Sequence, residues 1–384
     1  MSQDVATLER EIRALVAADQ LEDAEQRLRI ILASGTGPLV FWRQLAHVLR
    51  QQGRPGAALP IQRMIVEANP GDLTARFDLA EAQLLLGDFD AGWRGYRHRY
   101  GMPHTTGVER KVQGRRWEGE NLAGRTLLVH DEQGFGDTFQ FMRLLPLARQ
   151  RSQARVVFDV NPASLSLARR GLGEIDVVIP STELPPPFDA HCELMSLPMV
   201  LGLGLSDLPG KLPYLTPDPA RLQHWRSRLS HLPRPLVALT WAGRPTHTND
   251  ANRSMNLDML AGLAVPGVHF LAIQKGPAAA QALTPPVGMA ITSLDAEITD
   301  FEDTAAILML PDVLVSVDSA PVHLAGALGR PAWVMLPLLP DWRWLTERTD
   351  TPWYPQHRLF RQTQRRQWHN VVAEIAQALR GLVG

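Results

Sequence analysis

The chain has 384 residues, which is enough for two or three domains of ordinary size. Hydrophobic residues make up 45% and charged residues 21%, as in a typical soluble globular protein, and the net charge of −1 excludes a strong overall attraction to nucleic acid or anionic membranes. A single cysteine, Cys192, excludes an internal disulfide framework and a cysteine-based metal site. Because the N-terminus is charged and amphipathic and no run of about 18 apolar residues occurs, we expect a cytoplasmic protein without a transmembrane segment.

Small residues recur at a spacing of 34 in the first hundred residues. Gly53 and Gly87 share this spacing, as do Ala24, Ala58 and Gly92. Small side chains at fixed places allow paired helices to pack closely, so the pattern resembles about three tetratricopeptide repeats over residues 1–102. The alternative is an unrelated helical bundle. Repeat arrays form concave surfaces that suit peptides or partner proteins, although these helices could instead mediate a homodimer.

Residues 103–117 are polar and lack a sustained period, so we interpret them as a linker. Apolar runs then alternate with helical patterns, which predicts parallel strands buried on both faces in a doubly wound α/β fold. We expect two Rossmann-like domains over residues 118–232 and 233–366, with an amphipathic helix at 367–384. The expected strands are residues 126–130, 154–160, 175–180, 236–242, 268–274, 312–318 and 332–336.

The first of these strands ends in the run HDEQGFGDT, residues 130–138. Gly134 and Gly136 permit a tight turn or a close approach of the backbone, and a helix is expected to begin near Asp137 or Thr138. Asp137 could be an N-cap, or it could be a general base or acceptor-binding group at the mouth of a cleft. The run lacks the spacing of a dinucleotide fingerprint or a Walker loop.

In the second domain, the expected strand DVLVSVD is followed by SAPVHLAGALGRP. Asp318 and Ser319 stand at the strand end, Pro321 suits the first helical turn, and His323 and Gly326 follow on the helix. A helix N-terminus with small residues can bind a diphosphate. The alternative is a capped helix that packs on the sheet with His323 as a structural histidine.

Two more loops of the second domain follow strands. Trp241 and Gly243 form the turn after the strand LVALTWA, and Arg244 and Arg253 are nearby cations that can reach phosphate oxygens. A polar pair, Gln274–Lys275, ends the next strand. Three such loops in one domain favour a binding site over chance surface loops.

These motifs together resemble a known family. The segments WAGRPTHTNDANRS, IQKGP, SVDSAPVHLAGALGRP and PDWRWLTERTDTPWYP are similar to bacterial tetratricopeptide-repeat proteins whose C-terminal part resembles the heptosyltransferases of glycosyltransferase family 9. The similarity to O-GlcNAc transferases is more distant. The resemblance implies a GT-B fold, in which two Rossmann-like domains face a cleft, with the nucleotide-sugar donor on the C-terminal domain and the acceptor on the N-terminal one.

The resemblance also implies roles for individual residues. Gly136 and Asp137 match the Gly-Asp of the family's first loop, in which the aspartate is the catalytic base. The D-[ST]-x-x-x-H-L-A signature matches Asp318, Ser319 and His323, near the donor phosphates. The acceptor-side loop would contain Gln133, Gly134 and Gly136. The other expected donor-binding residues are Arg253 as the first candidate for the diphosphate, Arg244 as the second, and Trp241, Gly243, Gln274, Lys275 and Gly326.

The two expected α/β domains lack a DxD motif, which agrees with a transferase that needs no cofactor and no metal. The resemblance implies an inverting transfer, and the concave surface of a repeat array leads us to expect a protein acceptor held by the repeats. A second hypothesis is a non-catalytic binding module, in which the repeats hold a partner and the α/β part is a degenerate sensor. A third hypothesis, an epimerase acting on a nucleotide sugar, would leave the repeats unexplained.

Overall fold

The computed structural model describes residues 5–33, 35, 37–101, 112, 114–208 and 210–383. The chain divides into two compact units. The helical unit contains Met1–Glu109 and Leu338–Glu347, and the α/β unit contains Arg110–Pro337 and Arg348–Gly384. Most of the predicted linker 103–117 lies outside the described residues, which include only 112 and 114–117 of it.

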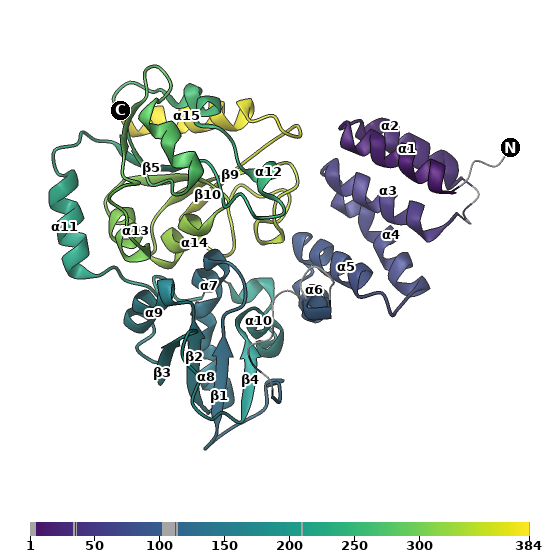
Figure 1. Cartoon of the computed structure of the whole chain (residues 1–384), viewed down its shortest axis with the longest axis horizontal. Helices are drawn as coiled ribbons and strands as arrows, with labels where there is room; N and C mark the ends of the chain where they lie inside the picture. Colours follow the sequence, from purple (N-terminus) through teal and green to yellow (C-terminus); the bar gives the residue numbers. More distant parts are fainter. Residues whose placement is uncertain are drawn as a thin grey trace. The chain divides into compact units, whose positions relative to one another are not determined.

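The helical unit consists of successive helix pairs (Figure 1). The first helices of the pairs begin at residues 5, 39 and 73 and the second helices at residues 21, 55 and 89, so both series advance by 34 residues. The bounds are α1 (Val5–Ala17), α2 (Leu21–Ile31), α3 (Leu39–Gln51), α4 (Pro55–Ala68), α5 (Leu73–Leu85) and α6 (Phe89–Tyr96), followed by the 3-10 helix η1 (Arg97–Gly101). The predicted helix pairs at this spacing are therefore present.

Small residues allow close helix contacts within this unit. Ala24 and Ala58 are completely buried, and a Cβ placed on Gly92 would lie 2.6 Å from Cγ of Leu84. Any larger side chain at Gly92 would push α5 and α6 apart. Close helix packing is therefore the physical reason that small residues recur every 34 positions in this unit.

A segment from late in the chain also belongs to the helical unit. Residues 338–347, which include η8 (Trp342–Trp344), lie between two strands of the larger sheet in sequence. The Trp342 ring packs edge-on against Trp93, with centroids 5.0 Å apart, and against Tyr96 at 5.9 Å. The sequence analysis placed this segment in the domain 233–366, whereas its aromatic contacts join it to the helices.

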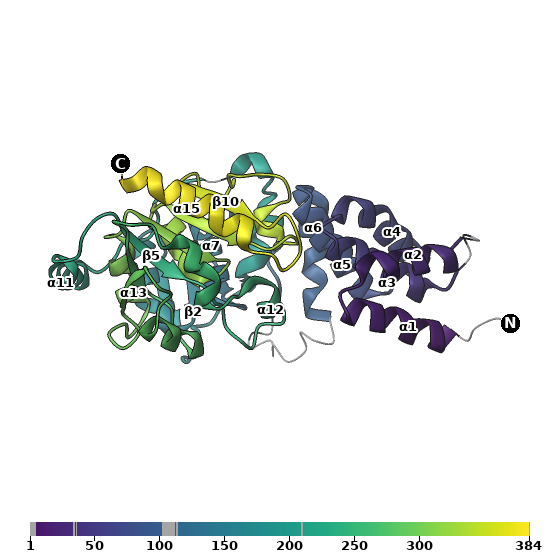
Figure 2. The same cartoon turned by 90° about the horizontal axis from the view of Figure 1, so that it is seen from above.

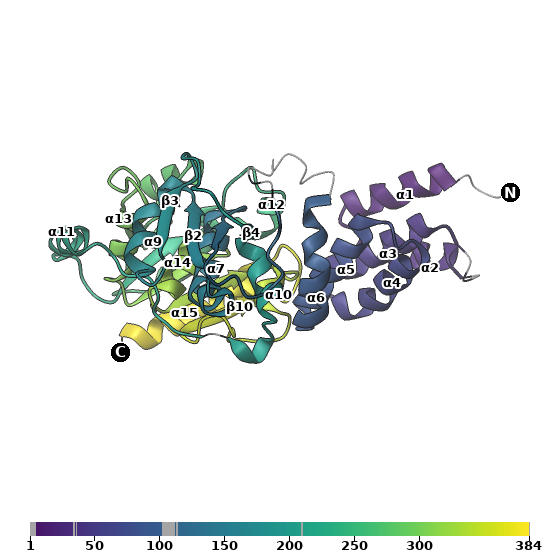
Figure 3. The same cartoon turned by 90° about the horizontal axis from the view of Figure 1, so that it is seen from below.

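The first half of the α/β unit is built on a four-stranded sheet in the order β3-β2-β1-β4 (Figure 1; Figure 3 shows β3, β2 and β4 from below). All of its strand pairs are parallel. The strands are β1 (Thr126–His130), β2 (Arg155–Val160), β3 (Val177–Pro180) and β4 (Ala190–Glu193). The helices are α7 (Phe135–Phe141), η2 (Met142–Leu144), α8 (Leu145–Ser152), η3 (Pro162–Ser164), α9 (Leu165–Gly171), η4 (Leu194–Ser196), α10 (Leu197–Leu201) and η5 (Leu205–Asp207).

The second half is built on a six-stranded sheet in the order β10-β9-β8-β5-β6-β7, again with parallel pairs throughout. The C-terminal helix α15 (His369–Val383) packs its apolar side against this sheet and η6 (Figure 2). The strands are β5 (Leu236–Thr240), β6 (His269–Ala272), β7 (Ala290–Ser293), β8 (Val313–Val317), β9 (Ala332–Leu336) and β10 (His357–Arg361). The other helices are α11 (Pro219–Leu229), α12 (Asp250–Arg253), η6 (Leu257–Leu263), η7 (Pro277–Leu283), α13 (Phe301–Leu308) and α14 (Ala320–Ala327).

Each of the seven predicted strands is present, with ends that differ by at most two residues. The sequence analysis missed β4, β7 and β10, which are all edge strands of their sheets. Their sequences, AHCE, AITS and HRLFR, contain polar residues and no continuous apolar run. Among the described residues, none of the helices combines the length and the apolar character needed to cross a membrane.

Candidate functional site

The loop after β1 is braced by its own acidic residues. The Asp131 carboxylate accepts a hydrogen bond from the backbone amide of Asn161 at 2.7 Å, and the Glu132 carboxylate accepts one from the backbone amide of Met195 at 3.1 Å. Helix α7 begins at Phe135, two residues earlier than the earliest predicted start. The two acidic side chains therefore tie the end of β1 to the loops that follow β2 and β4. Gln133 and Gly134 are exposed on the same loop.

Asp137 is the third residue of α7 rather than its N-cap. Its Oδ2 accepts a hydrogen bond from the Gly134 amide at 2.9 Å, so the carboxylate satisfies one of the donors that a helix start leaves unpaired. The side chain is partly exposed. The N-cap role that the sequence left open is therefore wrong; Asp137 instead accepts the amide of the N-cap residue Gly134 from the third helical position, and this bond holds the carboxylate at the start of the helix.

Gly136 lies where α7 of the first half meets α14 of the second half. A Cβ placed on Gly136 would lie 2.8 Å from Cδ2 of His323 and 3.6 Å from Cα of Ala320. Only a glycine permits this approach without a shift of the buried imidazole. The predicted acceptor-side loop and the predicted phosphate-side motif are therefore neighbours in space, although 187 residues separate Gly136 from His323.

Hydroxyl groups join the ends of β5 and β8 below the start of α14. Ser319 occupies the N-cap position of α14, and its Oγ lies 3.2 Å from Oγ of Ser316. The Ser316 hydroxyl in turn lies 2.5 Å from the Thr240 hydroxyl. This chain of hydroxyls fixes the turn in which Asp318 and Ser319 stand.

His323 is buried one turn into α14. Its Nδ1 lies 3.1 Å from the Tyr354 hydroxyl, and its Nε2 lies 3.8 Å from Oδ1 of Asp318. A Cβ placed on Gly326, on the same helix, would lie 2.2 Å from Cδ1 of Tyr354. The glycine at position 326 is therefore required for packing against the Tyr354 ring.

Arg253 reaches the same strand end from α12. Its Nη1 donates a hydrogen bond to the Asp318 carbonyl at 2.9 Å, and a Cβ on Gly243 would lie 2.7 Å from its Nη2. The Gly243 amide donates to Oγ of Ser254 at 2.8 Å. Arg244 is exposed. The structure thus places the first cationic candidate beside Asp318, whereas the second points into solvent.

Gln274 and Trp241 are buried in the loops after β6 and β5. The Gln274 Oε1 accepts hydrogen bonds from the Trp241 and Ala242 amides, both at 2.9 Å, and the Trp241 indole donates to Oε1 of Gln281 at 2.9 Å. Both side chains therefore brace the loops through their polar atoms.

Lys275, next in the chain, points away from Arg253 toward the loop after β7. Its Nζ contacts the Asp295 carbonyl at 2.6 Å, the Asp295 carboxylate at 2.9 Å and the Ile298 carbonyl at 3.1 Å. Three contacts account for the three donors of an ammonium group. The structure does not bring Lys275 together with Asp318 and His323.

The sequence analysis missed Arg143, a buried residue that links the two halves. Its Nη1 donates to the Trp353 carbonyl at 2.9 Å and its Nη2 donates to the Tyr214 hydroxyl at 3.1 Å. The guanidinium carbon lies 4.7 Å from the Tyr354 ring centre, so the cation also contacts the partner of His323. A lone arginine within the apolar run FQFMRLLPLA was the available signal.

His357 lies beneath this cluster on β10. Its ring centre is 4.6 Å from that of Tyr354. Burial, together with the charge that His323 can carry, lowers the pKa of His357 to about 3. The imidazole is therefore neutral in the folded protein at neutral pH.

Comparison with known proteins gives a distant relative and several similar folds. No family model matches the chain. Protein FlbA of Caulobacter vibrioides is 29% identical over 341 residues, which cover 81% of this chain and 56% of that protein. The chain thus spans little more than half the length of this curated relative.

Two solved structures are weakly similar to about two thirds of the chain. ADP-heptose lipopolysaccharide heptosyltransferase II of E. coli has 15% identity and a TM-score of 0.47, with 67% of this chain and 98% of that chain covered. A glycosyl transferase family 9 protein of Veillonella parvula has 10% identity and a TM-score of 0.47, with 69% and 99% covered. Values this low do not assign an activity or a substrate to this chain.

Proposed function

We propose that the chain is a glycosyltransferase that moves a sugar from a nucleotide-sugar donor to an acceptor hydroxyl, and that its α/β unit is of the GT-B type. One observation carries this proposal: the contact of Gly136 with His323 brings together the first turns of α7 and α14, which follow β1 and β8 of two different sheets. Ligands of parallel sheets bind beyond the carboxyl ends of the strands, and two such ends meet here.

The donor diphosphate would bind beside Asp318 and Ser319, at the start of α14. Backbone amides at a helix start and a nearby guanidinium are both suited to an anion. Arg253, which is held against the Asp318 carbonyl, is our candidate for that guanidinium. With these groups available for the leaving diphosphate, the transfer would need no metal at the donor.

Asp137 would act as the general base. In an inverting transfer, the carboxylate takes the proton of the acceptor hydroxyl, the hydroxyl oxygen bonds to the anomeric carbon, and the bond to the diphosphate breaks in the same displacement. No covalent glycosyl-enzyme forms. The hydrogen bond from the Gly134 amide orients the carboxylate for this role.

The helical unit would hold the acceptor, for which we propose a protein segment. The 34-residue period of its helix pairs supports tetratricopeptide repeats, which bind extended segments on their concave side. A cavity of about 560 Å³ lies within this unit and is lined by residues that include Arg43, His47, Arg50 and Asp78. If the helices served instead to pair two copies, the isolated chain would be a dimer in solution.

A non-catalytic binding module is the second candidate. Four of the residues predicted to bind the donor have internal structural roles: Trp241 and Gln274 brace loops, Lys275 holds the loop after β7, and Gly326 packs against an aromatic ring. These roles explain the residues without any donor. The transferase proposal depends instead on Asp137, Arg253, Asp318 and Ser319.

Thermal unfolding with a panel of nucleoside diphosphates and nucleotide sugars tests the donor site. A ligand that binds only the folded state adds about 2.7 kcal/mol of stability at a hundredfold excess over Kd. We expect one base series to raise the Tm of the α/β unit by a few degrees. If every nucleotide leaves the Tm of well-folded protein unchanged, the transferase proposal fails and the binding module is preferred.

A further inference from the structure

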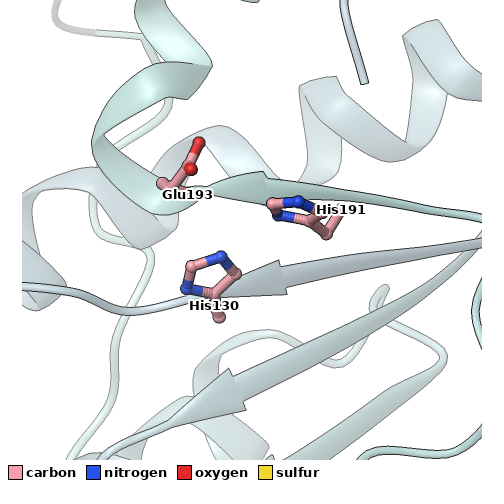
Figure 4. A group of neighbouring side chains, drawn as sticks. All are labelled: His130, His191 and Glu193. Atoms are coloured by element: carbon pink, nitrogen blue, oxygen red, sulfur yellow. The ribbon is translucent and has the colours of Figure 1, made fainter. Parts of the chain in front are cut away.

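Three potential metal ligands gather at the carboxyl ends of two adjacent strands in the four-stranded half. His130 ends β1, and His191 and Glu193 lie on β4 (Figure 4). The strand register pairs His130 with Glu193, and His191 stands two residues before Glu193, so all three side chains belong to one face of the sheet. Their ligand atoms all lie within 4.8 Å of one another.

His191 gives the strongest evidence for a ligand. Its side chain is 1% exposed, and its Nδ1 has no hydrogen-bond partner within the part of the chain that the structure describes. The Gly114 backbone lies beside the same imidazole, since a Cβ placed on Gly114 would be 3.8 Å from Cδ2 of His191. Either ring nitrogen of a neutral imidazole can bind a metal ion, so Nδ1 of His191 is the candidate ligand atom.

Glu193 is also buried, and it is already oriented. Its Oε1 accepts two hydrogen bonds from Arg116, at 2.9 and 2.6 Å, and its Oε2 lies 3.3 Å from the Ser196 hydroxyl. Arg116 neutralises the carboxylate and so explains how Glu193 can be buried. It does not explain why Nδ1 of His191 is buried without a hydrogen bond, an arrangement that destabilises the folded state.

We propose that His130, His191 and Glu193 bind one divalent transition-metal ion of the Zn²⁺ class. Two imidazoles and one carboxylate are a donor set that Zn²⁺ and Fe²⁺ accept, whereas Mg²⁺ and Ca²⁺ prefer oxygen ligands alone. Bonds of about 2.0–2.2 Å in a tetrahedron place ligand atoms roughly 3.4 Å apart, so the ligand atoms, which lie within 4.8 Å of one another, need to approach by at most about 1.4 Å on binding. Three protein ligands leave a fourth position for water or a substrate oxygen.

This site is separate from the residues proposed for the donor. The ligands lie on the four-stranded sheet, whereas Arg253, Asp318 and Ser319 follow strands of the six-stranded sheet. The inference therefore does not depend on the transferase activity. The proposal departs from the expectation of a protein without a metal. That expectation rests on the groups that stabilise the leaving diphosphate, and it does not consider these three residues.

Metal binding to the full chain tests the proposal directly. The purified protein is treated with chelator, dialysed against a limited series of Zn²⁺ concentrations and analysed for bound metal, and Co²⁺ is used in parallel because its visible absorption reports the coordination geometry. His191→Gln and His130→Gln are compared with His224→Gln, which changes an exposed histidine on α11. Circular dichroism verifies the fold of each variant.

We expect the wild type and His224→Gln to bind one Zn²⁺ tightly, and each cluster variant to lose more than about tenfold in affinity together with the Co²⁺ spectrum. His130 is partly exposed, so His130→Gln still provides the test if His191→Gln does not fold. The proposal is overturned if the folded cluster variants bind Zn²⁺ as the wild type does, or if the wild type binds none.

Discussion

The helices α7 and α14 each begin shortly after the carboxyl end of a parallel strand, β1 and β8 respectively, but their starts are built differently. At α7 a carboxylate on the third helical residue, Asp137, accepts the amide of Gly134. At α14 the turn is fixed by serine and threonine hydroxyls, and a buried His323–Tyr354 pair lies one turn further along. The first start can therefore change its capping side chain with a local effect, whereas the second is joined to a buried network.

The two starts also depend on each other. Gly136 of α7 packs directly against the His323 ring of α14. This contact fixes the distance between the predicted base, Asp137, and the predicted phosphate site at the start of α14. A change of the Asp137 carboxylate should therefore affect chemistry, whereas changes where α7 meets α14 should affect stability as well. The following variants test that difference, in order of decreasing effect.

Asp137→Asn should have the largest effect. The amide oxygen can still accept the Gly134 amide, so the helix start is preserved while the base is lost, and the rate of transfer should fall by about 10²- to 10⁴-fold. Turnover with the donor found by thermal unfolding gives the measurement. Asp207→Asn is a matched control, because Asp207 accepts the Gly204 amide at 2.7 Å in the same way on the exposed helix η5. Equal rates for both variants would refute the assignment of the base.

Gly136→Ala should destabilise the α/β unit by about 1–3 kcal/mol, because the new methyl group meets the buried His323 ring. Gly134→Ala should change stability far less, since its Cβ would meet only Oδ2 of Asp137 at 3.3 Å and its φ is −75°. Denaturant midpoints of the two variants measure the difference. Similar midpoints would show that α7 and α14 do not meet as described.

The pH dependence of stability should report on the buried network at the start of α14, because His357 packs against the Tyr354 ring whose hydroxyl contacts His323. The pKa of His357 is about 3 in the folded protein and about 6.5 when unfolded, so the unfolded state binds the extra proton between these values. His357 therefore does not lower the free energy of unfolding above about pH 6.5. As the pH falls below this value, protonation of His357 in the unfolded state lowers the free energy of unfolding, by about 2 kcal/mol at pH 5.

His357→Gln should therefore flatten the fall of Tm between pH 7 and pH 5 relative to the wild type. His224→Gln, on the exposed side of α11, should leave it as it is. An unchanged slope in His357→Gln would show that another group controls the acid sensitivity.

Arg253→Gln should weaken the binding of the effective nucleoside diphosphate about tenfold, since a charge-assisted contact to phosphate is lost. Arg244→Gln should have a smaller effect because that side chain is exposed to solvent. Isothermal titration measures both, with Arg226→Gln on α11 as a control for the general loss of a positive charge. A larger loss in Arg244→Gln would exchange the two assignments.

Much of the architecture could be predicted from local pattern. The 34-residue recurrence of small residues predicted the helix pairs, and continuous apolar runs predicted six inner strands and the edge strand β3. The sequence analysis missed the edge strands β4, β7 and β10 because polar residues interrupt their apolar positions, although β4 is completely buried. The segment 338–347 was misplaced because its contacts with Trp93 and Tyr96 are distant in sequence.

The sequence by itself determined which residues cap helices, end strands and carry charge, since these depend on neighbours a few positions apart. Only the tertiary structure decided that Gly136 meets His323, that Lys275 turns away from the site, and that His130 joins His191 and Glu193 from 61 residues away. Contacts of this kind depend on strand order and helix packing, which a local pattern does not encode.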